Sequence, residues 1–110
     1  MPVRELSPRE LSRAMEGPEP ERPVILDVRN SDEVQVASIR GSMHVPLNEL
    51  PARLDEVRDL ADRPVVVVCH LGMRSYHAAV FLDSVGIPAA SLRGGIDAWA
   101  ADVDPQMPRY

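Results

Sequence analysis

The feature that most constrains the fold is a run of four valines, Val65–Val68, in the middle of the chain. β-Branched residues favour strands, and a strand that is apolar at every position must be buried on both faces. Such strands occupy the centre of parallel sheets, which carry helices on their two faces. The run therefore predicts an α/β fold with a mostly parallel central sheet flanked by helices on both faces.

The segments around this run alternate between strand and helix patterns. Short apolar stretches predict two more buried strands, at residues 24–28 and 88–92, and a brief strand near Met43–Val45. Helices are predicted over residues 7–15, 30–37, 48–60, 75–85 and 94–101. A chain of 110 residues suits one core, so we expect a single domain over residues 1–110. Its core should span about residues 6–101, followed by a polar C-terminal tail at 102–110.

The composition argues against several classes of function. The net charge is −5 and no Lys/Arg-rich block is present, so binding to nucleic acid or to an anionic membrane is not expected. A single cysteine excludes an internal disulfide, and without a CxxC or HExxH pattern we predict no metal site and no cofactor. No apolar segment is long enough for a membrane span or resembles a signal peptide, so we expect a cytoplasmic protein or a module of a larger cytoplasmic protein.

That single cysteine, Cys69, directly follows the valine run and begins a short polar loop. Ligand sites of parallel sheets lie beyond the carboxyl ends of the strands. Three segments should converge there, namely Asp27–Arg29, Cys69–Arg74 and Arg93–Gly95. Ser75 is a residue type that favours helix N-caps, so we expect the loop to end at the start of the helix over residues 75–85.

The loop has the features of an anion-binding cradle. Successive backbone N–H groups next to a helix N-terminus can point at one anion, Gly72 permits a tight turn, and Arg74 adds a positive charge. A free thiol is only a few per cent ionised at neutral pH, and a helix N-terminus with a nearby arginine supplies roughly the 2 kcal/mol needed to change that. We therefore predict that Cys69 is a nucleophile and that the substrate-binding residues are His70, Leu71, Gly72, Met73 and Arg74.

The other polar residues near strand ends are expected to be structural. We expect Asp27 to accept nearby backbone N–H groups and Arg29 to pair with Glu33. Packing, surface or backbone-contact roles, and not catalysis, are expected for His44, His70, His77, Gly94, Gly95 and Trp99.

Four segments, in the expected order, resemble the signatures of rhodanese-like sulfurtransferases: "ILDVRNSDE", "IRGSMHVPL", "CHLGMRS" and "LRGGIDAW". The resemblance covers the chain from about Ser7 to Trp99 and implies a single rhodanese domain. It further implies that Cys69 takes a sulfane sulfur from a donor such as thiosulfate or a persulfide, holds it as a persulfide, and passes it to cyanide or a protein thiol. Ser38 and Arg40 depart from the family pattern, which usually has histidine and proline there.

Two other functions stay open. The domain could be a sulfur-relay or protein-interaction module with little turnover, exchanging sulfur with a protein thiol or a sulfur-carrier partner. A phosphatase or arsenate reductase is the third possibility, but four residues separate Cys69 from Arg74 where cysteine-dependent phosphatases have five. The smaller ring suits a single sulfur atom better than a phosphate.

Overall fold

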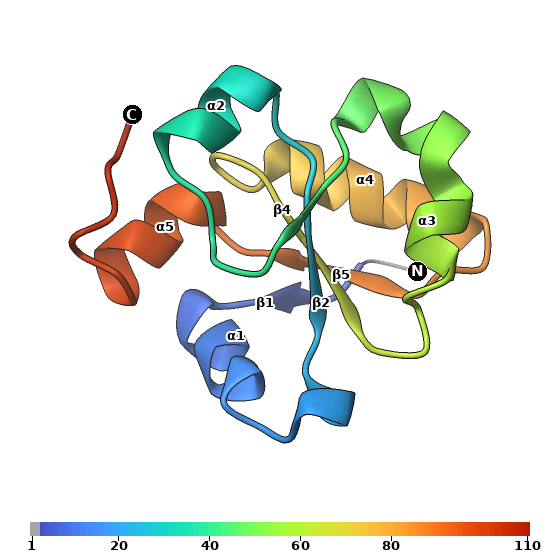
Figure 1. Ribbon diagram of the computed structural model, residues 1–110, viewed down its shortest axis with the longest axis horizontal. Helices are drawn as coiled ribbons and strands as arrows, with labels where there is room; N and C mark the ends of the chain where they lie inside the picture. Colours follow the sequence, from blue (N-terminus) through green and yellow to red (C-terminus); the bar gives the residue numbers. More distant parts are fainter. Residues whose placement is uncertain (1–2) are drawn as a thin grey trace.

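A parallel sheet runs through the centre of the protein, with helices on both sides (Figure 1). The computed structural model describes residues 3–110. The strands are β1 (Glu5–Leu6), β2 (Val24–Asp27), β3 (Met43–His44), β4 (Val65–Val68) and β5 (Ala89–Leu92). The helices are α1 (Pro8–Met15), α2 (Ser31–Val36), α3 (Leu54–Arg58), α4 (Met73–Ser84) and α5 (Gly95–Asp102), with 3₁₀ turns η1 (Glu19–Glu21) and η2 (Leu47–Arg53). The five strands lie in the order β1-β5-β4-β2-β3, and each neighbouring pair is parallel.

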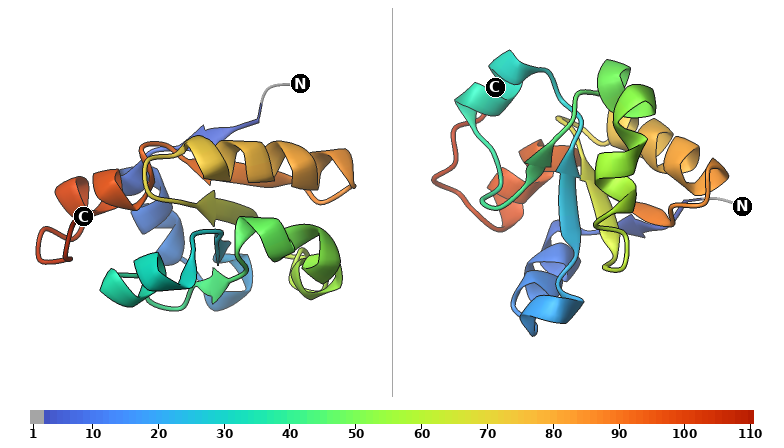
Figure 2. Two further views of the ribbon diagram at one scale, coloured as in Figure 1. Left: turned by 90° about the horizontal axis from the view of Figure 1, so that it is seen from above. Right: turned by 45° about the vertical axis from the view of Figure 1, so that its right-hand side comes forward.

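The valine strand β4 is the central strand, as predicted, and its side chains alternate between two separate cores. Val65 and Val67 pack in a core covered by α3 and α4, whereas Val66 and Val68 pack in a core covered by α1 and α5. Figure 2 shows these helices on opposite sides of the sheet. The prediction of an α/β fold with helices on both faces is therefore confirmed.

The predicted elements mostly form, with small differences in their bounds. Ser7 caps α1 together with Glu10, as their spacing suggests, because each side chain bonds the other residue's backbone N–H. The helix predicted over residues 48–60 is divided into η2 and α3. Pro51 lies inside η2, and a proline lacks the N–H that a continuous α-helix needs. Across residues 3–110, no helix combines the length and the apolar character needed to cross a bilayer.

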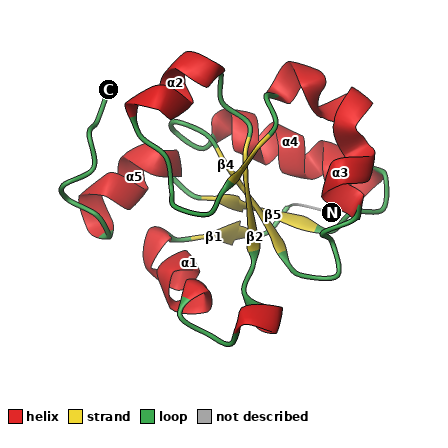
Figure 3. Cartoon of the chain, in the orientation of Figure 1, coloured by secondary structure: helices red, strands yellow, loops and turns green. Residues whose placement is uncertain are grey.

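The predicted polar tail packs against the rest of the protein. Val103 and Met107 contact the core that α1 and α5 cover, and Arg109 forms an ion pair with Asp97 of α5. Figure 3 shows this segment as a loop that leaves α5 and turns toward α2. The tail therefore returns to the carboxyl ends of β2 and β4. There Tyr110 contacts Arg29, which follows β2, and Glu33 of α2.

Candidate active site

The candidate active site lies where β2 and β4 end side by side. The strand after β2 in the sequence, β3, lies on one side of this pair, and the strand after β4, β5, lies on the other side. A parallel sheet opens a crevice at such a reversal of strand order. Asp27–Arg29 follows β2 and Cys69 follows β4, so the topology brings these two predicted segments to the same crevice.

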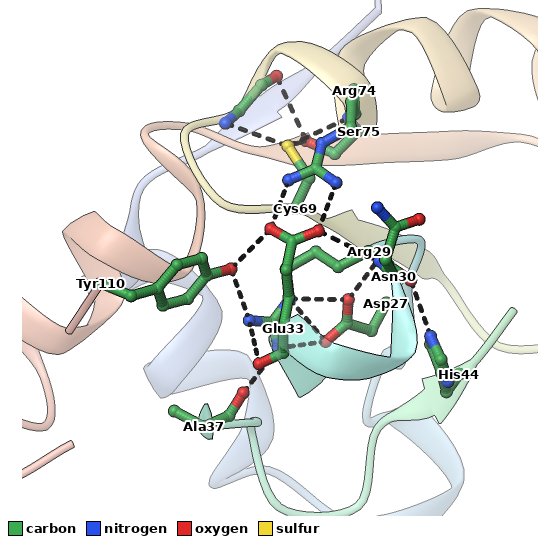
Figure 4. A network of polar contacts seen from close by, with 11 residues as sticks. Asp27, Arg29, Asn30, Glu33, Ala37, His44, Cys69, Arg74, Ser75 and Tyr110 are labelled. Carbon is green, nitrogen blue, oxygen red and sulfur yellow. Dashed lines mark hydrogen bonds and ion pairs between the residues drawn. The ribbon is translucent and has the colours of Figure 1, made fainter. Parts of the chain in front are cut away.

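The sulfur of Cys69 is held by backbone N–H groups at the N-terminus of α4 (Figure 4). The N–H groups of Gly72 and Ser75 donate to Sγ at 3.1 and 3.2 Å. Cys69 is only 1% exposed, so these donors contact the sulfur in a site largely shielded from water. Two N–H dipoles at a helix N-terminus are complementary to negative charge at the position that they surround. Of residues 70–74, which were predicted to form the cradle, Gly72 donates its N–H to the sulfur. Ser75, outside the predicted range, is a second donor.

The prediction that Ser75 caps the helix is wrong. The helix α4 begins at Met73, and Gly72 precedes it with a φ of 106°, a left-handed conformation that a glycine adopts without strain. This turn brings the chain directly from the loop into the helix and places Ser75 in the first turn. In the first turn of α4, the N–H of Ser75 donates to the sulfur.

A buried pair of hydroxyl groups lies behind the sulfur. Ser75 Oγ lies 3.4 Å from Cys69 Sγ, 2.8 Å from Ser91 Oγ on β5 and 3.2 Å from the carbonyl oxygen of Gly72. Within residues 3–110, Ser75 is the hydrogen-bond partner found for the Ser91 hydroxyl. A buried hydroxyl proton needs an acceptor, so Ser91 donates to Ser75. The Ser75 proton is then free to point at the Gly72 carbonyl or at the sulfur.

The first turn of α5 fixes the other side of the loop. The N–H groups of Ile96 and Asp97 donate to the carbonyls of Cys69 and His70 at 2.8 and 3.1 Å. The N–H group in each of those peptide planes points away from α5, opposite to its carbonyl. Gly95 makes this contact possible, because a Cβ there would overlap the His70 carbonyl. The third predicted segment, Arg93–Gly95, therefore also reaches the site, and Gly95 allows the close approach expected of it.

Arg74 does not point its charge into an empty cradle. Its two terminal nitrogens donate to the two carboxylate oxygens of Glu33 on α2, at 2.6 and 2.8 Å. The Glu33 carboxylate also accepts from the N–H of Asn30 at 3.1 Å and from the hydroxyl of Tyr110 at 2.9 Å. The hydrogen bonds from Arg74 lower the pKa of Glu33 from 4.5 to about 2. At neutral pH the positive charge of Arg74 is therefore balanced by a carboxylate in direct contact.

The predicted pairing of Arg29 with the Glu33 side chain is also wrong. Both Arg29 and Asp27 are buried, and the Arg29 guanidinium lies 2.7 Å from the Asp27 carboxylate. Glu33 offers Arg29 only its backbone carbonyl, at 3.3 Å. Asp27 also accepts the backbone N–H of Arg29 at 3.1 Å, as expected. The ion pair forms between residues two apart because both project from the end of β2, which leaves the Glu33 carboxylate for Arg74.

Tyr110 connects the tail to this network and was not predicted to contact the site. Its hydroxyl accepts a hydrogen bond from Arg29 at 2.8 Å and donates one to Glu33, while its ring stacks on His70 with a centroid distance of 4.0 Å. Burial raises the pKa of the Tyr110 phenol, which keeps it protonated and able to donate. One side chain therefore contacts the end of β2, α2 and the cysteine loop together.

The histidines have the structural positions expected of them. Nε2 of His44 lies 2.7 Å from the carbonyl of Arg29, and His77 is exposed on α4. The side chains of Leu71 and Met73 point outward and are 64% and 74% exposed. On the outer side of the loop they border a cavity of about 430 Å³, whose other lining residues are Glu5, Gly72, Tyr76, His77, Arg93 and Gly94.

A parallel α/β sheet with a cysteine loop at the start of a helix is the architecture of rhodanese-like domains, and the family model for the rhodanese-like domain matches residues 7–102. The chain belongs to this family. A sulfurtransferase of Allochromatium vinosum is 36% identical over 78 residues, which are 70% of this chain and 71% of that protein. The adenylyltransferase and sulfurtransferase UBA4 of Yarrowia lipolytica is 34% identical over 87 residues, 79% of this chain but only 22% of that protein.

The structural comparison agrees with the sequence matches. The crystal structure of a thiosulfate sulfurtransferase from Pseudomonas aeruginosa superposes with a TM-score of 0.78 and 33% identity, over 90% of this chain and 19% of that one. This chain therefore corresponds to a small part of some of the proteins that it resembles. The family and its sulfurtransferase members support sulfur transfer as the general activity.

Proposed function

We propose that this chain is a sulfurtransferase in which Cys69 carries a sulfane sulfur from thiosulfate or a persulfide donor to a thiophilic acceptor. The observation that supports this most directly is the pair of N–H donors, from Gly72 and Ser75, on the Cys69 sulfur. A thiolate is the nucleophilic form of cysteine, and these dipoles stabilise it without a histidine base.

Both steps of this transfer break a sulfur–sulfur bond, and Cys69 is a thiolate at the start of the first step and at the end of the second. The Cys69 thiolate attacks the sulfane sulfur, and the donor's sulfur bond breaks with its electron pair leaving on sulfite or on a thiolate. The acceptor then attacks the outer sulfur of the resulting persulfide, and the electron pair of that bond returns to Cys69. Fixed N–H groups around the Cys69 sulfur serve both steps, because they stabilise its negative charge before the first step and after the second.

The contacts of Arg74 argue against the phosphatase alternative. During its transfer, a phosphoryl group needs cationic groups that contact its oxygens. The terminal nitrogens of Arg74 are instead bonded to Glu33. This agrees with the short spacing between Cys69 and Arg74, and both features favour a sulfur atom over a phosphate as the group that is carried.

A sulfur-relay module is the second candidate, and the exposed apolar side chains of the loop favour it. Leu71 and Met73 extend from the cysteine loop into solvent, where a protein partner could cover them. The match to a small part of a larger adenylyltransferase and sulfurtransferase is consistent with work alongside other domains. In this case the sulfur on Cys69 would pass to a protein thiol and only slowly to cyanide.

Intact mass spectrometry after incubation with thiosulfate or an alkyl persulfide tests the covalent step. We expect a gain of one sulfur atom, about 32 Da, that a reductant removes and that Cys69→Ser lacks. Rapid discharge to cyanide would favour the enzyme, and discharge to a protein thiol alone would favour the relay module. A protein that gains no sulfur from any donor, or a gain that persists in Cys69→Ser, would contradict the proposal.

A further inference from the structure

We infer that Glu33 is a specificity-determining residue that disfavours doubly charged donors, so that the site takes sulfur from organic persulfides, R–S–SH, in preference to thiosulfate. The inference rests on the proposed role of Cys69 and concerns the choice of donor. Its basis is the charge that surrounds the sulfur, and the geometry of three ion pairs defines that charge.

Two of the three arginines in the converging segments are each matched by a carboxylate. Arg74 is bonded to Glu33, and the buried Arg29 is bonded to Asp27. At the start of α5, beneath the loop, Asp97 is bonded to Arg109. Each pair sums to zero charge, so an approaching anion meets no excess of positive side-chain charge at this edge of the sheet. Attraction is left to the backbone N–H groups.

Arg93 is the remaining arginine of the converging segments, and it lies on the other side of the loop. It lines the cavity bordered by Leu71 and Met73, together with Glu5, and Cys69 does not line that cavity. Because Arg93 lines a cavity to which Cys69 does not contribute, it is a poor replacement for Arg74. The balance of charge near the sulfur is therefore set by Arg74 and Glu33.

Glu33 is held firmly in its position. Its carboxylate accepts hydrogen bonds from both terminal nitrogens of Arg74, from the backbone N–H of Asn30 and from the Tyr110 hydroxyl. The lowered pKa of Glu33 keeps the carboxylate ionised throughout the physiological range. A donor cannot easily displace a group with this many partners, so Glu33 keeps its ion pair with Arg74 as the donor arrives.

The two classes of donor differ in the charge that they add. Attack of the Cys69 thiolate on thiosulfate joins one negative charge to two, and sulfite leaves with two. Attack on a protonated persulfide adds none: the thiolate and R–S–SH become the Cys69 persulfide, Cys–S–SH, and the thiolate R–S⁻. Pairing Arg74 with Glu33 slows the reaction with thiosulfate more than the reaction with a persulfide. The reason is that repulsion between the thiolate and the donor grows with the product of their charges.

The test measures the second-order rate at which Cys69 gains one sulfur atom, followed by intact mass, for three donors. These are thiosulfate, 2-hydroxyethyl persulfide and serum albumin carrying a persulfide on its free thiol. We expect either persulfide to load the protein at least about tenfold faster than thiosulfate. The faster of the two persulfides shows whether the carrier is small or macromolecular, and either result supports the inference.

The decisive variant is Glu33→Gln, which removes the charge but keeps an acceptor for the Asn30 N–H. We expect the rate ratio of thiosulfate to 2-hydroxyethyl persulfide to rise about tenfold. The matched control is Glu56→Gln, which removes one charge from an ion pair with Arg53 on the surface and should change the ratio less than about twofold. An unchanged ratio in Glu33→Gln would overturn the inference.

The unmodified protein gives a second reading that does not depend on any variant. Salt screens repulsion as well as attraction, so its effect shows the sign of the interaction. We expect thiosulfate loading to accelerate as the salt concentration rises, and a slower rate would overturn the inference. If no donor loads Cys69, the proposed function fails instead, so the two failures are distinguishable.

Discussion

Glu33 and Arg74, 41 residues apart in the sequence, form a two-point ion pair that fastens α2 to the first turn of α4, directly after the cysteine loop. The contact is short at both ends, and the Glu33 side chain is only 16% exposed. A planar guanidinium facing a carboxylate fixes orientation as well as distance. The position of the loop therefore depends on a helix that contributes no atom to the cradle around the sulfur.

This pair predicts a stability that depends on pH. The pKa of Glu33 in the folded protein lies at about 2, below its ordinary value of 4.5. Its contribution is therefore fully present above about pH 4.5 and is lost as the pH falls toward 2. We expect Glu33→Gln to lower the free energy of unfolding by about 2 kcal/mol at pH 7 and by much less near pH 2. Urea titrations at several pH values measure this difference, and a difference that is the same at every pH would contradict it.

The hydroxyl of Ser75 predicts the reactivity of Cys69. We expect Ser75→Ala, which keeps the backbone N–H but loses the hydroxyl, to slow alkylation of Cys69 by iodoacetamide at pH 7 about tenfold. Ser91→Ala should slow it less, because it removes only the partner that orients Ser75. The control is Ser84→Ala, whose hydroxyl donates to the carbonyl of Phe81 at the far end of α4. If Ser75→Ala and Ser84→Ala react equally fast, the hydroxyl does not act on the sulfur.

Tyr110 predicts a stabilising contribution from the tail. In Tyr110→Phe the ring can still stack on His70, but Arg29 loses an acceptor and Glu33 loses a donor. We expect the free energy of unfolding to fall by about 1–2 kcal/mol, since a buried guanidinium N–H is left without its partner. Tyr76→Phe on α4 is the matched control. Equal stabilities of the two variants would show that the Tyr110 contact is not maintained in solution.

Gly95 predicts how tightly α5 is packed against the cysteine loop. A Cβ at Gly95 would overlap the His70 carbonyl, whereas a Cβ at Gly86, which also has a positive φ, would meet no atom within 4 Å. We expect Gly86→Ala to cost about 1 kcal/mol from backbone strain alone. Gly95→Ala should cost about 3 kcal/mol or more and should slow sulfur loading of Cys69. Urea unfolding of the two variants side by side tests this, and similar losses would argue against a tight contact.

The parts of the fold that could be predicted are those that depend on a local pattern within a short stretch of sequence. The valine run Val65–Val68 is apolar without alternation, and this pattern alone predicts the centre of a parallel sheet. Cys69 and Gly72 follow it within a few residues, so the end of β4 and the loop could be placed together. The strand β1, Glu5–Leu6, is only two residues long and is formed by pairing with β5, so no local pattern announces it.

The ion pairs could not be predicted, because the partner of each charged side chain depends on which elements the fold brings together. The sequence predicted Arg29 as the partner of Glu33, but Arg29 pairs with Asp27 at the end of β2, and Glu33 pairs with Arg74. Tyr110 lies in a segment without helix or strand periodicity, so its contact with Arg29 has no signature in the sequence. Ser75 was wrongly predicted to be the N-cap of α4. The N-cap is Gly72, whose left-handed conformation begins the helix without a side-chain cap.

The contact between Tyr110 and the β2 end has a consequence for biosynthesis. All five strands and the cysteine loop precede residue 110 in the sequence, so the ribosome adds them to the chain before the residue that joins Arg29 to Glu33. The Tyr110 hydroxyl can contact Arg29 and Glu33 only after residue 110 has left the ribosomal exit tunnel. Final setting of the loop is therefore a late event in the life of the nascent chain.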